Sequence, residues 1–123
     1  MPQVKLDNYL RTFRKMRGFT QREVAFLLGR HNKAKVSRYE NSRRVPSLET
    51  IFAYEVILGM PAHELFAGIQ ERAQRHAMHR VRLLRRRLER QTTDPELAQK
   101  VNFLRALAEG GANELHYEAV PKT

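Results

Sequence analysis

The sequence contains no cysteine, which excludes both a disulfide framework and a metal site built on thiolates. It has no apolar run long enough to cross a bilayer, and its start lacks the pattern of a signal peptide, so the expected location is cytoplasmic. No nucleophile–base pair, glycine-rich phosphate loop or paired carboxylates stand out, and we therefore expect neither an enzyme nor a cofactor. His63, His76 and His79 lack an acidic partner to complete a converging ligand set, which argues against a metal site.

Acidic residues are scarce in comparison with basic ones. The 123 residues include 13 aspartates and glutamates against 23 lysines and arginines, and the formal net charge is +10. This excess favours a polyanionic partner, most simply nucleic acid. A chain of this length accommodates one small domain and an appendage, and its small core favours association with a partner chain.

Residues 20–46, TQREVAFLLGRHNKAKVSRYENSRRVP, are predicted to form two short helices joined by a tight turn. Thr20 and Glu23 have the spacing of a capping box, in which each side chain accepts a hydrogen bond from the other residue's backbone amide. Gly29 is expected to end the first helix, because a residue without Cβ readily adopts a left-handed conformation. The apolar residues of this helix share one face: Val24, Leu27 and Leu28.

The second helix of this pair is predicted to run from Lys33 to Asn41. Only Val36 and Tyr39 face inward, and the other faces carry basic and hydrogen-bonding side chains. This helix is suited to the major groove of DNA, because one face anchors it in the core and its outer face carries basic and hydrogen-bonding side chains.

Segments on both sides of this pair continue a recognisable pattern. In chain order the segments are Phe13-Arg14, Gly18-Phe19-Thr20-Gln21, Val24-Ala25, Leu28-Gly29, Val36-Ser37-Arg38-Tyr39-Glu40, Arg43-Arg44, Pro46-Ser47-Leu48 and Glu64-Leu65-Phe66. Together they resemble the lambda-repressor/Cro type of helix-turn-helix, also called the XRE family, over residues 6–67. The resemblance implies an all-α fold with a five-helix DNA-binding domain in residues 1–67. It also implies a transcriptional regulator, a repressor that binds palindromic double-stranded DNA as a homodimer.

The resemblance also implies roles for individual residues. It pairs Arg14 with Glu40, and two partly buried charges persist in a small core only as a hydrogen-bonded pair. It places Gln21 where a glutamine touches DNA and steadies the second helix of the motif. The candidate base-reading residues are Lys33, Ala34, Lys35, Ser37 and Arg38. The candidate phosphate-binding residues are Asn41, Arg43 and Arg44.

Three positions depart from the family pattern. The segment from Gly29 to Glu40 is one residue longer than usual, so the turn or the start of the second helix must differ. Ser42 stands where a glycine is usual, so Asn41 or Ser42 must close that helix by another route. Glu55 stands where a small apolar residue is usual.

Helical spacing predicts the remaining elements of this domain. The first helix should cover residues 4–17, with an inner face of Leu6, Leu10, Phe13 and either Met16 or Arg17. A helix capped by Ser47 should run to Leu58, with a stripe of Leu48, Ile51, Tyr54 and Leu58. A short fifth helix should cover residues 62–66.

The chain then continues into a predicted helical hairpin, residues 68–110, with Gly68 as the only weak break. The first helix of the hairpin has a seam of apolar residues at helical steps: Ile69, Ala73, Ala77, Val81, Leu84 and Leu88. Asp94 as N-cap and Pro95 at the first position should begin the second helix. Its stripe consists of Leu97, Val101, Leu104 and either Leu107 or Ala108. Residues 111–123 show no periodicity, and we interpret them as a flexible tail.

The hairpin is consistent with more than one partner. Apolar stripes on both helices favour a homodimer, whereas an antitoxin or adaptor would use the same helices to hold another protein. The basic run Arg80–Arg90 could be the solvated face of a helix or a second nucleic-acid contact. The second interpretation of this run would also fit an RNA-binding module.

Overall fold

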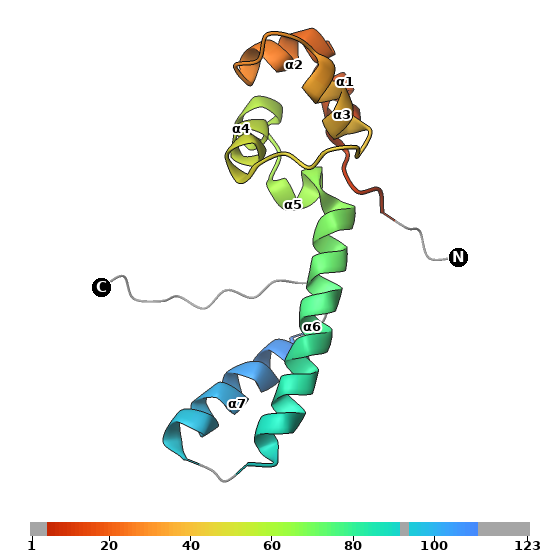
Figure 1. Cartoon of the computed structure of the whole chain (residues 1–123). Coiled ribbons are helices and arrows are strands. Elements are labelled where there is room, and N and C mark those ends of the chain that lie inside the picture. Colours follow the sequence, from red (N-terminus) through yellow and green to blue (C-terminus); the bar gives the residue numbers. More distant parts are fainter. Residues whose placement is uncertain (1–4, 92–93, 111–123) are drawn as a thin grey trace. The chain divides into compact units, whose positions relative to one another are not determined.

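The computed structural model describes residues 5–91 and 94–110, and within them the chain forms seven helices and no strand (Figure 1). In chain order the helices are α1 (Leu10–Met16), α2 (Gln21–Leu27), α3 (Ala34–Glu40), α4 (Leu48–Leu58), α5 (Ala62–Leu65), α6 (Ala67–Glu89) and α7 (Pro95–Glu109). The prediction of an all-α fold is confirmed. The predicted tail, residues 111–123, lies outside the described residues.

The chain divides into two compact units between Gln70 and Glu71, at a point within α6. Helices α1 to α5 belong to the first unit, and α7 belongs to the second. Within residues 5–91 and 94–110, no helix combines the length and the apolarity that a bilayer crossing requires.

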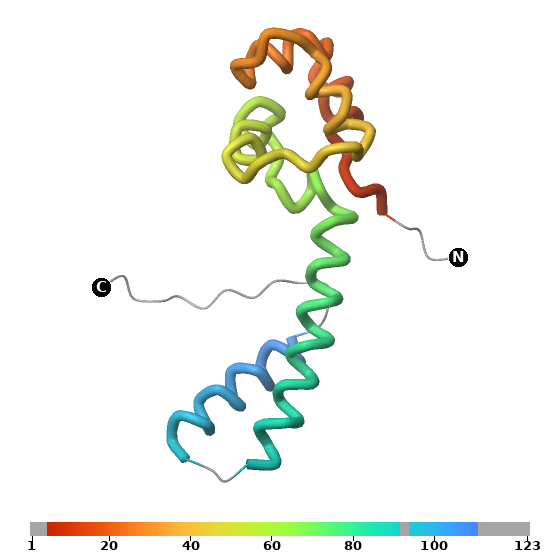
Figure 2. The backbone as a smooth tube through the Cα atoms, in the orientation of Figure 1, coloured from red at the N-terminus to blue at the C-terminus, as the bar shows by residue number. Residues whose placement is uncertain are grey.

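Helices α1 to α5 enclose one hydrophobic core, and the path of the chain around it can be followed in Figure 2. Each helix contributes a fully buried side chain, in chain order Leu10, Val24, Val36, Leu58 and Leu65. Burial of one such side chain stabilises a fold by about 1.5–3 kcal/mol. The rings of Tyr39 and Tyr54 meet edge to face in the same core, with their centroids 6.3 Å apart.

The limits of α2 are set by its local sequence. Thr20 Oγ1 accepts a hydrogen bond from the amide of Glu23 at 3.1 Å, and Glu23 Oε1 accepts one from the amide of Thr20 at 2.9 Å. Gly29 follows the helix in the left-handed region, with φ of +75°. The predicted capping box and the predicted glycine stop are both confirmed. Leu27, which the sequence places on the inner face, is 47% exposed.

The first helix is shorter than the sequence predicts, because α1 begins only at Leu10 and residues 5–9 are not helical. The amide of Leu10 donates to the side-chain Oδ1 of Asn8 at 3.1 Å. The amide of Tyr9 donates to the carbonyl oxygen of Leu65 at 2.7 Å. If α1 began earlier, these two amides would bond to carbonyl groups within the helix. They bond to Asn8 and Leu65 instead, and residues 5–9 form a non-helical segment that we call the strap.

Gly68 lies inside α6 where the strap comes closest to that helix. Its amide donates to the carbonyl oxygen of Leu6 at 2.8 Å, and a Cβ built on Gly68 would lie 2.2 Å from the same oxygen. Gly68 therefore permits a close approach of two backbones and does not break the helix. The predicted inner positions at Leu6 and Met16 are wrong, since these side chains are 60% and 68% exposed.

Two side-chain caps set the starts of α4 and α5. Ser47 Oγ accepts a hydrogen bond from the amide of Thr50 at 3.2 Å, which confirms the predicted cap. Glu55 Oε1 accepts one from the amide of Ala62, the first residue of α5, at 2.6 Å. This bond accounts for the carboxylate at position 55, because it satisfies an amide that has no partner within its own helix. Leu48, predicted to face inward, is 66% exposed.

Helices α6 and α7 meet as a hairpin in the second unit. Asp94 Oδ1 accepts a hydrogen bond from the amide of Leu97 at 2.7 Å, and Pro95 is the first residue of α7, as predicted. The side chain of Leu97 is buried. Arg105 Nη2 donates to Glu89 Oε1 at 3.2 Å and joins the two helices.

The buried side of α6 is rotated from the predicted seam. Val81 and Leu88 are half-buried as the sequence predicts, but Leu84 is 42% exposed. Ala73 and Ala77 are also exposed. The other half-buried side chains of this part of α6 are Gln74, Met78, Arg82 and Arg85, and Met78 and Arg85 lie on the same side as Val81 and Leu88. A flexible methionine and the aliphatic part of an arginine side chain both cover apolar surface well. A search for apolar periodicity does not detect an arginine in this role.

The close approach at Gly68 predicts that Gly68→Ala destabilises the protein by about 1–3 kcal/mol, because the new methyl group would overlap the Leu6 carbonyl oxygen. Helix propensity predicts the opposite sign, since alanine is favoured over glycine by about 1 kcal/mol. Chemical denaturation of both proteins measures the difference. Ala73→Gly at an exposed position of the same helix is the control and should lose about 1 kcal/mol through propensity alone. A Gly68→Ala protein as stable as the wild type would contradict the close contact.

Candidate nucleic-acid interface

The predicted pair of Arg14 and Glu40 is present and ties α1 to α3. Arg14 Nε donates to Glu40 Oε2 at 2.6 Å, and Nη2 donates to Oε1 at 3.1 Å. The two side chains are 11% and 2% exposed. Arg14 Nη1 also donates to the carbonyl oxygen of Phe19 at 3.0 Å, so all three guanidinium nitrogens have protein acceptors. Two-point contact between the planar groups fixes the orientation of α3 as well as its position.

Gln21, the first residue of α2, adds a second tie to the same carboxylate. Its Nε2 donates to Glu40 Oε1 at 3.1 Å. Glu40 therefore accepts hydrogen bonds from residues on α1 and on α2, and the two helices of the motif are joined through it. The side chain of Gln21 is half-buried and still reaches the surface.

The start of α3 accommodates the extra residue that follows Gly29. The helix begins at Ala34, whose amide donates to Asn32 Oδ1 at 3.0 Å. Lys33 is the N-cap and contributes no side-chain bond to the helix end. The additional residue is thus taken up in the turn between Gly29 and Ala34, and the hydrogen bond that Asn32 Oδ1 accepts from Ala34 closes that turn.

The end of α3 is closed by Ser42, one of the two routes that the sequence leaves open. Ser42 has φ of +59°, and its amide donates to the carbonyl oxygen of Tyr39 at 3.1 Å. Asn8 Nδ2 donates to the same carbonyl oxygen at 2.9 Å and to Ser42 Oγ at 3.3 Å. A left-handed serine is strained in comparison with glycine, and the bonds from the strap residue Asn8 support it.

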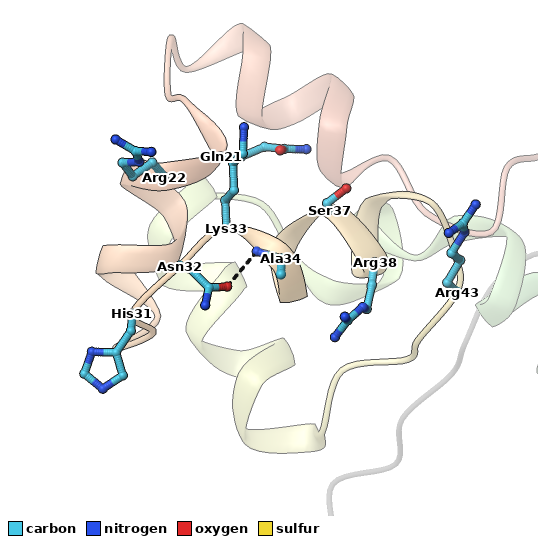
Figure 3. Close-up of a pocket in the computed structure, with 9 residues that line it drawn as sticks. All are labelled: Gln21, Arg22, His31, Asn32, Lys33, Ala34, Ser37, Arg38 and Arg43. Carbon is cyan, nitrogen blue, oxygen red and sulfur yellow. Dashed lines mark hydrogen bonds between the residues drawn. The ribbon is translucent and has the colours of Figure 1, made fainter.

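The outer faces of α2 and α3 line an open depression (Figure 3). Its lining residues are Gln21, Arg22, His31, Asn32, Lys33, Ala34, Ser37, Arg38 and Arg43. Six of the nine sequence candidates are among them: Gln21, Lys33, Ala34, Ser37, Arg38 and Arg43. The other three, Lys35, Asn41 and Arg44, do not line it.

Three residues of this depression are missing from the sequence-based candidates. Arg22 follows Gln21 in the first turn of α2, and His31 and Asn32 lie in the turn before α3. The sequence signal that could have found Arg22 is its position directly after Gln21, which is itself a candidate. The two turn residues give no periodic signal, and only the folded turn brings them to the rim.

Positive charge is concentrated near Lys35. The guanidinium of Arg30, followed by that of Arg44, lowers the pKa of the Lys35 ammonium below its ordinary value, and burial and Arg38 contribute less. Like charges held this close repel one another, and a bound anion would relieve that repulsion. This part of the surface is therefore suited to a polyanion.

The comparison with known proteins agrees with this geometry. A family model described as a helix-turn-helix matches residues 10–65, which is the span of α1 to α5. Neither a curated protein nor a solved structure matches the chain. The resemblance to the lambda-repressor/Cro type that the motifs carry is thereby confirmed.

Removal of the Glu40 carboxylate should strongly destabilise the protein. Glu40→Ala leaves the Arg14 guanidinium buried without its partner, and such a loss costs about 3–5 kcal/mol. Thermal or chemical unfolding measures this. Glu71→Ala is the matched control, because Glu71 pairs with Arg75 at 3.9 Å on an exposed surface; it should change the stability by no more than about 1 kcal/mol. Equal melting temperatures for Glu40→Ala and wild type would show that the pair contributes little.

Proposed function

Residues 10–65 are a helix-turn-helix domain of the lambda-repressor/Cro-like, or XRE, family of DNA-binding transcriptional regulators, and from this premise we propose that the protein is a repressor that binds a palindromic operator as a homodimer. The observation that carries the proposal is the cationic depression along α2 and α3. It lies on a helix that the Arg14–Glu40 pair holds in a fixed orientation. Such a helix enters the major groove and reads base edges.

We assign base reading to the exposed face of α3 that lines the depression. Lys33 and Arg38 have the donors to reach guanine O6 and N7, and Ser37 between them can donate or accept. Ala34 offers a methyl group of its own to a thymine methyl. Lys35 contributes charge to the same helix from outside the depression.

We assign phosphate binding to residues that flank α3. Arg43 and Arg44 follow the helix on an exposed segment, and Asn41 is its C-cap. Arg22 lies at the opposite rim on α2. Contacts of this kind fix the register of a protein on the duplex and carry no sequence information directly. Gln21 would touch DNA while its amide holds Glu40.

Homodimerisation follows from the small reach of one recognition helix. A single helix contacts a few base pairs, and dimers of this class place two helices in major grooves about 34 Å apart. The hairpin of α6 and α7 supports a dimer, because it leaves Leu84 and Phe103 42% and 46% exposed. Ala77 is exposed seven residues before Leu84, on the same side of α6. Uncovered apolar side chains of this kind favour a symmetry-related copy.

The DNA assignment predicts different defects for two arginines. Arg38→Ala should weaken binding to the cognate site by about 1–3 kcal/mol and relax the preference at one base position. Arg43→Ala should weaken binding to all sequences alike and flatten the salt dependence by about one phosphate contact. Selection of sites from random duplex DNA, followed by titrations on cognate and random duplexes, measures both effects. Equal losses on the two duplexes for Arg38→Ala would reject base reading by Arg38.

The dimer assignment predicts that Leu84→Asp gives a monomer whose helix-turn-helix domain remains folded. A useful dimer has a dissociation constant of roughly micromolar or tighter, about −8 kcal/mol. Leu83→Asp is the matched control: Leu83 is similarly exposed, at 38%, but points about one hundred degrees further around the helix. Light scattering measures the mass, and circular dichroism checks the fold.

Two results would count against this dimer. A wild type that remains monomeric well above micromolar concentration would shift the hairpin to a different protein partner, as in an antitoxin or adaptor. A Leu84→Asp protein that is still dimeric would exclude this side of α6 from the contact.

A further inference from the structure

One face of α6 in the second unit is a row of cations. Arg80, Arg87 and Arg90 are exposed, with His76 before them and Leu83 between them. The spacing of four, three and four residues places His76, Arg80, Leu83 and Arg87 on one side of the helix. Arg90 directly follows Glu89, the last residue of α6. From His76 to Arg90 the row extends about 21 Å at the helical rise of 1.5 Å per residue. We call this row the arginine ridge.

The carboxylates of α6 do not neutralise this ridge. The helix contains two acidic residues. Glu71 lies 3.9 Å from Arg75, and Glu89 interacts with Arg85 and Arg105. Among the residues that the structure describes, no carboxylate lies within ion-pair distance of Arg80, Arg87 or Arg90.

The composition of this segment also distinguishes the ridge from an ordinary solvated surface. Residues 71–91 contain eight arginines and no lysine. Arginine has a planar fork of donors that matches phosphate oxygens, whereas lysine serves equally well for solubility. Arg82, Arg86 and Arg90 are spaced four residues apart, and like charges at that spacing weaken a helix. The helix dipole favours cations in the last turn, but it does not account for Arg80 in the middle of α6.

The ridge is exposed while the opposite side of α6 is covered. Val81 and Leu88 are half-buried on that opposite side, and the bond from Arg105 to Glu89 connects α7 to it. The helix that carries the ridge is thus held in place before any ligand binds. A ligand that binds along it meets side chains on a helix that is already formed and need not order the backbone.

We propose that the arginine ridge binds the phosphate backbone of duplex DNA outside the stretch that α3 reads. The inference rests on the proposed function, because a chain that is bound to DNA through α3 presents its ridge to the same duplex at a high effective concentration. The ridge makes no base-specific contact. It adds a sequence-independent, salt-sensitive term to the affinity and extends the length of duplex that the protein protects.

The test uses the whole 123-residue chain and compares two triple variants with substitutions at the same three arginine positions. The triple variant Arg80→Gln, Arg87→Gln, Arg90→Gln removes the charge. The triple variant with lysine at the same three positions keeps the charge and is the control. Each protein is titrated with a short duplex of about 20 base pairs, enough for two half-sites one turn apart. The titrations are repeated with a duplex of about twice that length, between about 50 and 200 mM salt.

The wild type should bind the longer duplex more tightly and with a steeper salt dependence. The glutamine variant should lose this gain, with the slope on the longer duplex flattened by about 2–3, since each phosphate contact contributes about 0.9. Its slope on the short duplex should be unchanged, and the lysine variant should keep most of the gain. Light scattering and thermal melting verify that both variants have the mass and the fold of the wild type.

Three results would overturn the proposal. The first is a glutamine variant with the wild-type slope on the longer duplex. The second is an equal loss on both lengths, which would place the contact within the operator. The third is tighter binding of duplex RNA than of duplex DNA by the ridge. The outcome is independent of base reading, because random-sequence duplexes suffice for these titrations. If the length-dependent effect of the ridge is present but site selection finds no preferred sequence, the ridge is supported and the repressor is rejected.

Discussion

The buried ion pair of Arg14 and Glu40 is the interaction on which the first unit depends. It joins α1, α2 and α3, because Glu40 also accepts a hydrogen bond from Gln21. Burial first and the charge of Glu40 second raise the pKa of the nearby Tyr54 phenol. The Arg14 guanidinium balances the charge of the Glu40 carboxylate. Such a pair adds little net stability in comparison with apolar packing. It does restrict α3 to one orientation, and a helix that reads base edges requires a fixed orientation.

Other polar contacts of this unit lie where its helices begin and end and where two segments cross. Asn8 supports the left-handed Ser42 at the end of α3, and Glu55 holds the start of α5. Gly68 lets the strap of residues 5–9 pass against α6. These bonds satisfy backbone groups where helices end, and a small apolar core between the helices is then sufficient. The outer faces of α2 and α3 are consequently left for a ligand.

The two roles that we propose for the second unit fall on different sides of one helix. One side of α6 is covered as part of the hairpin, and Leu84 lies at an uncovered edge. The arginine ridge occupies the remaining face. Apolar and cationic residues alternate along the sequence here, and the helical turn sorts them in space. In the proposed arrangement the same element would hold a second copy and a duplex without competition between the two.

The sequence by itself determined the features that depend on neighbours a few residues apart. These are the capping box at Thr20, the stop at Gly29 and the start of α7 at Asp94, and the order of the motifs also identified the helix-turn-helix and most residues of its depression. Only the tertiary structure decided where α1 begins and which side of α6 is buried. The amide of Tyr9 bonds to Leu65, and such long-range partners leave no periodic signal in the chain.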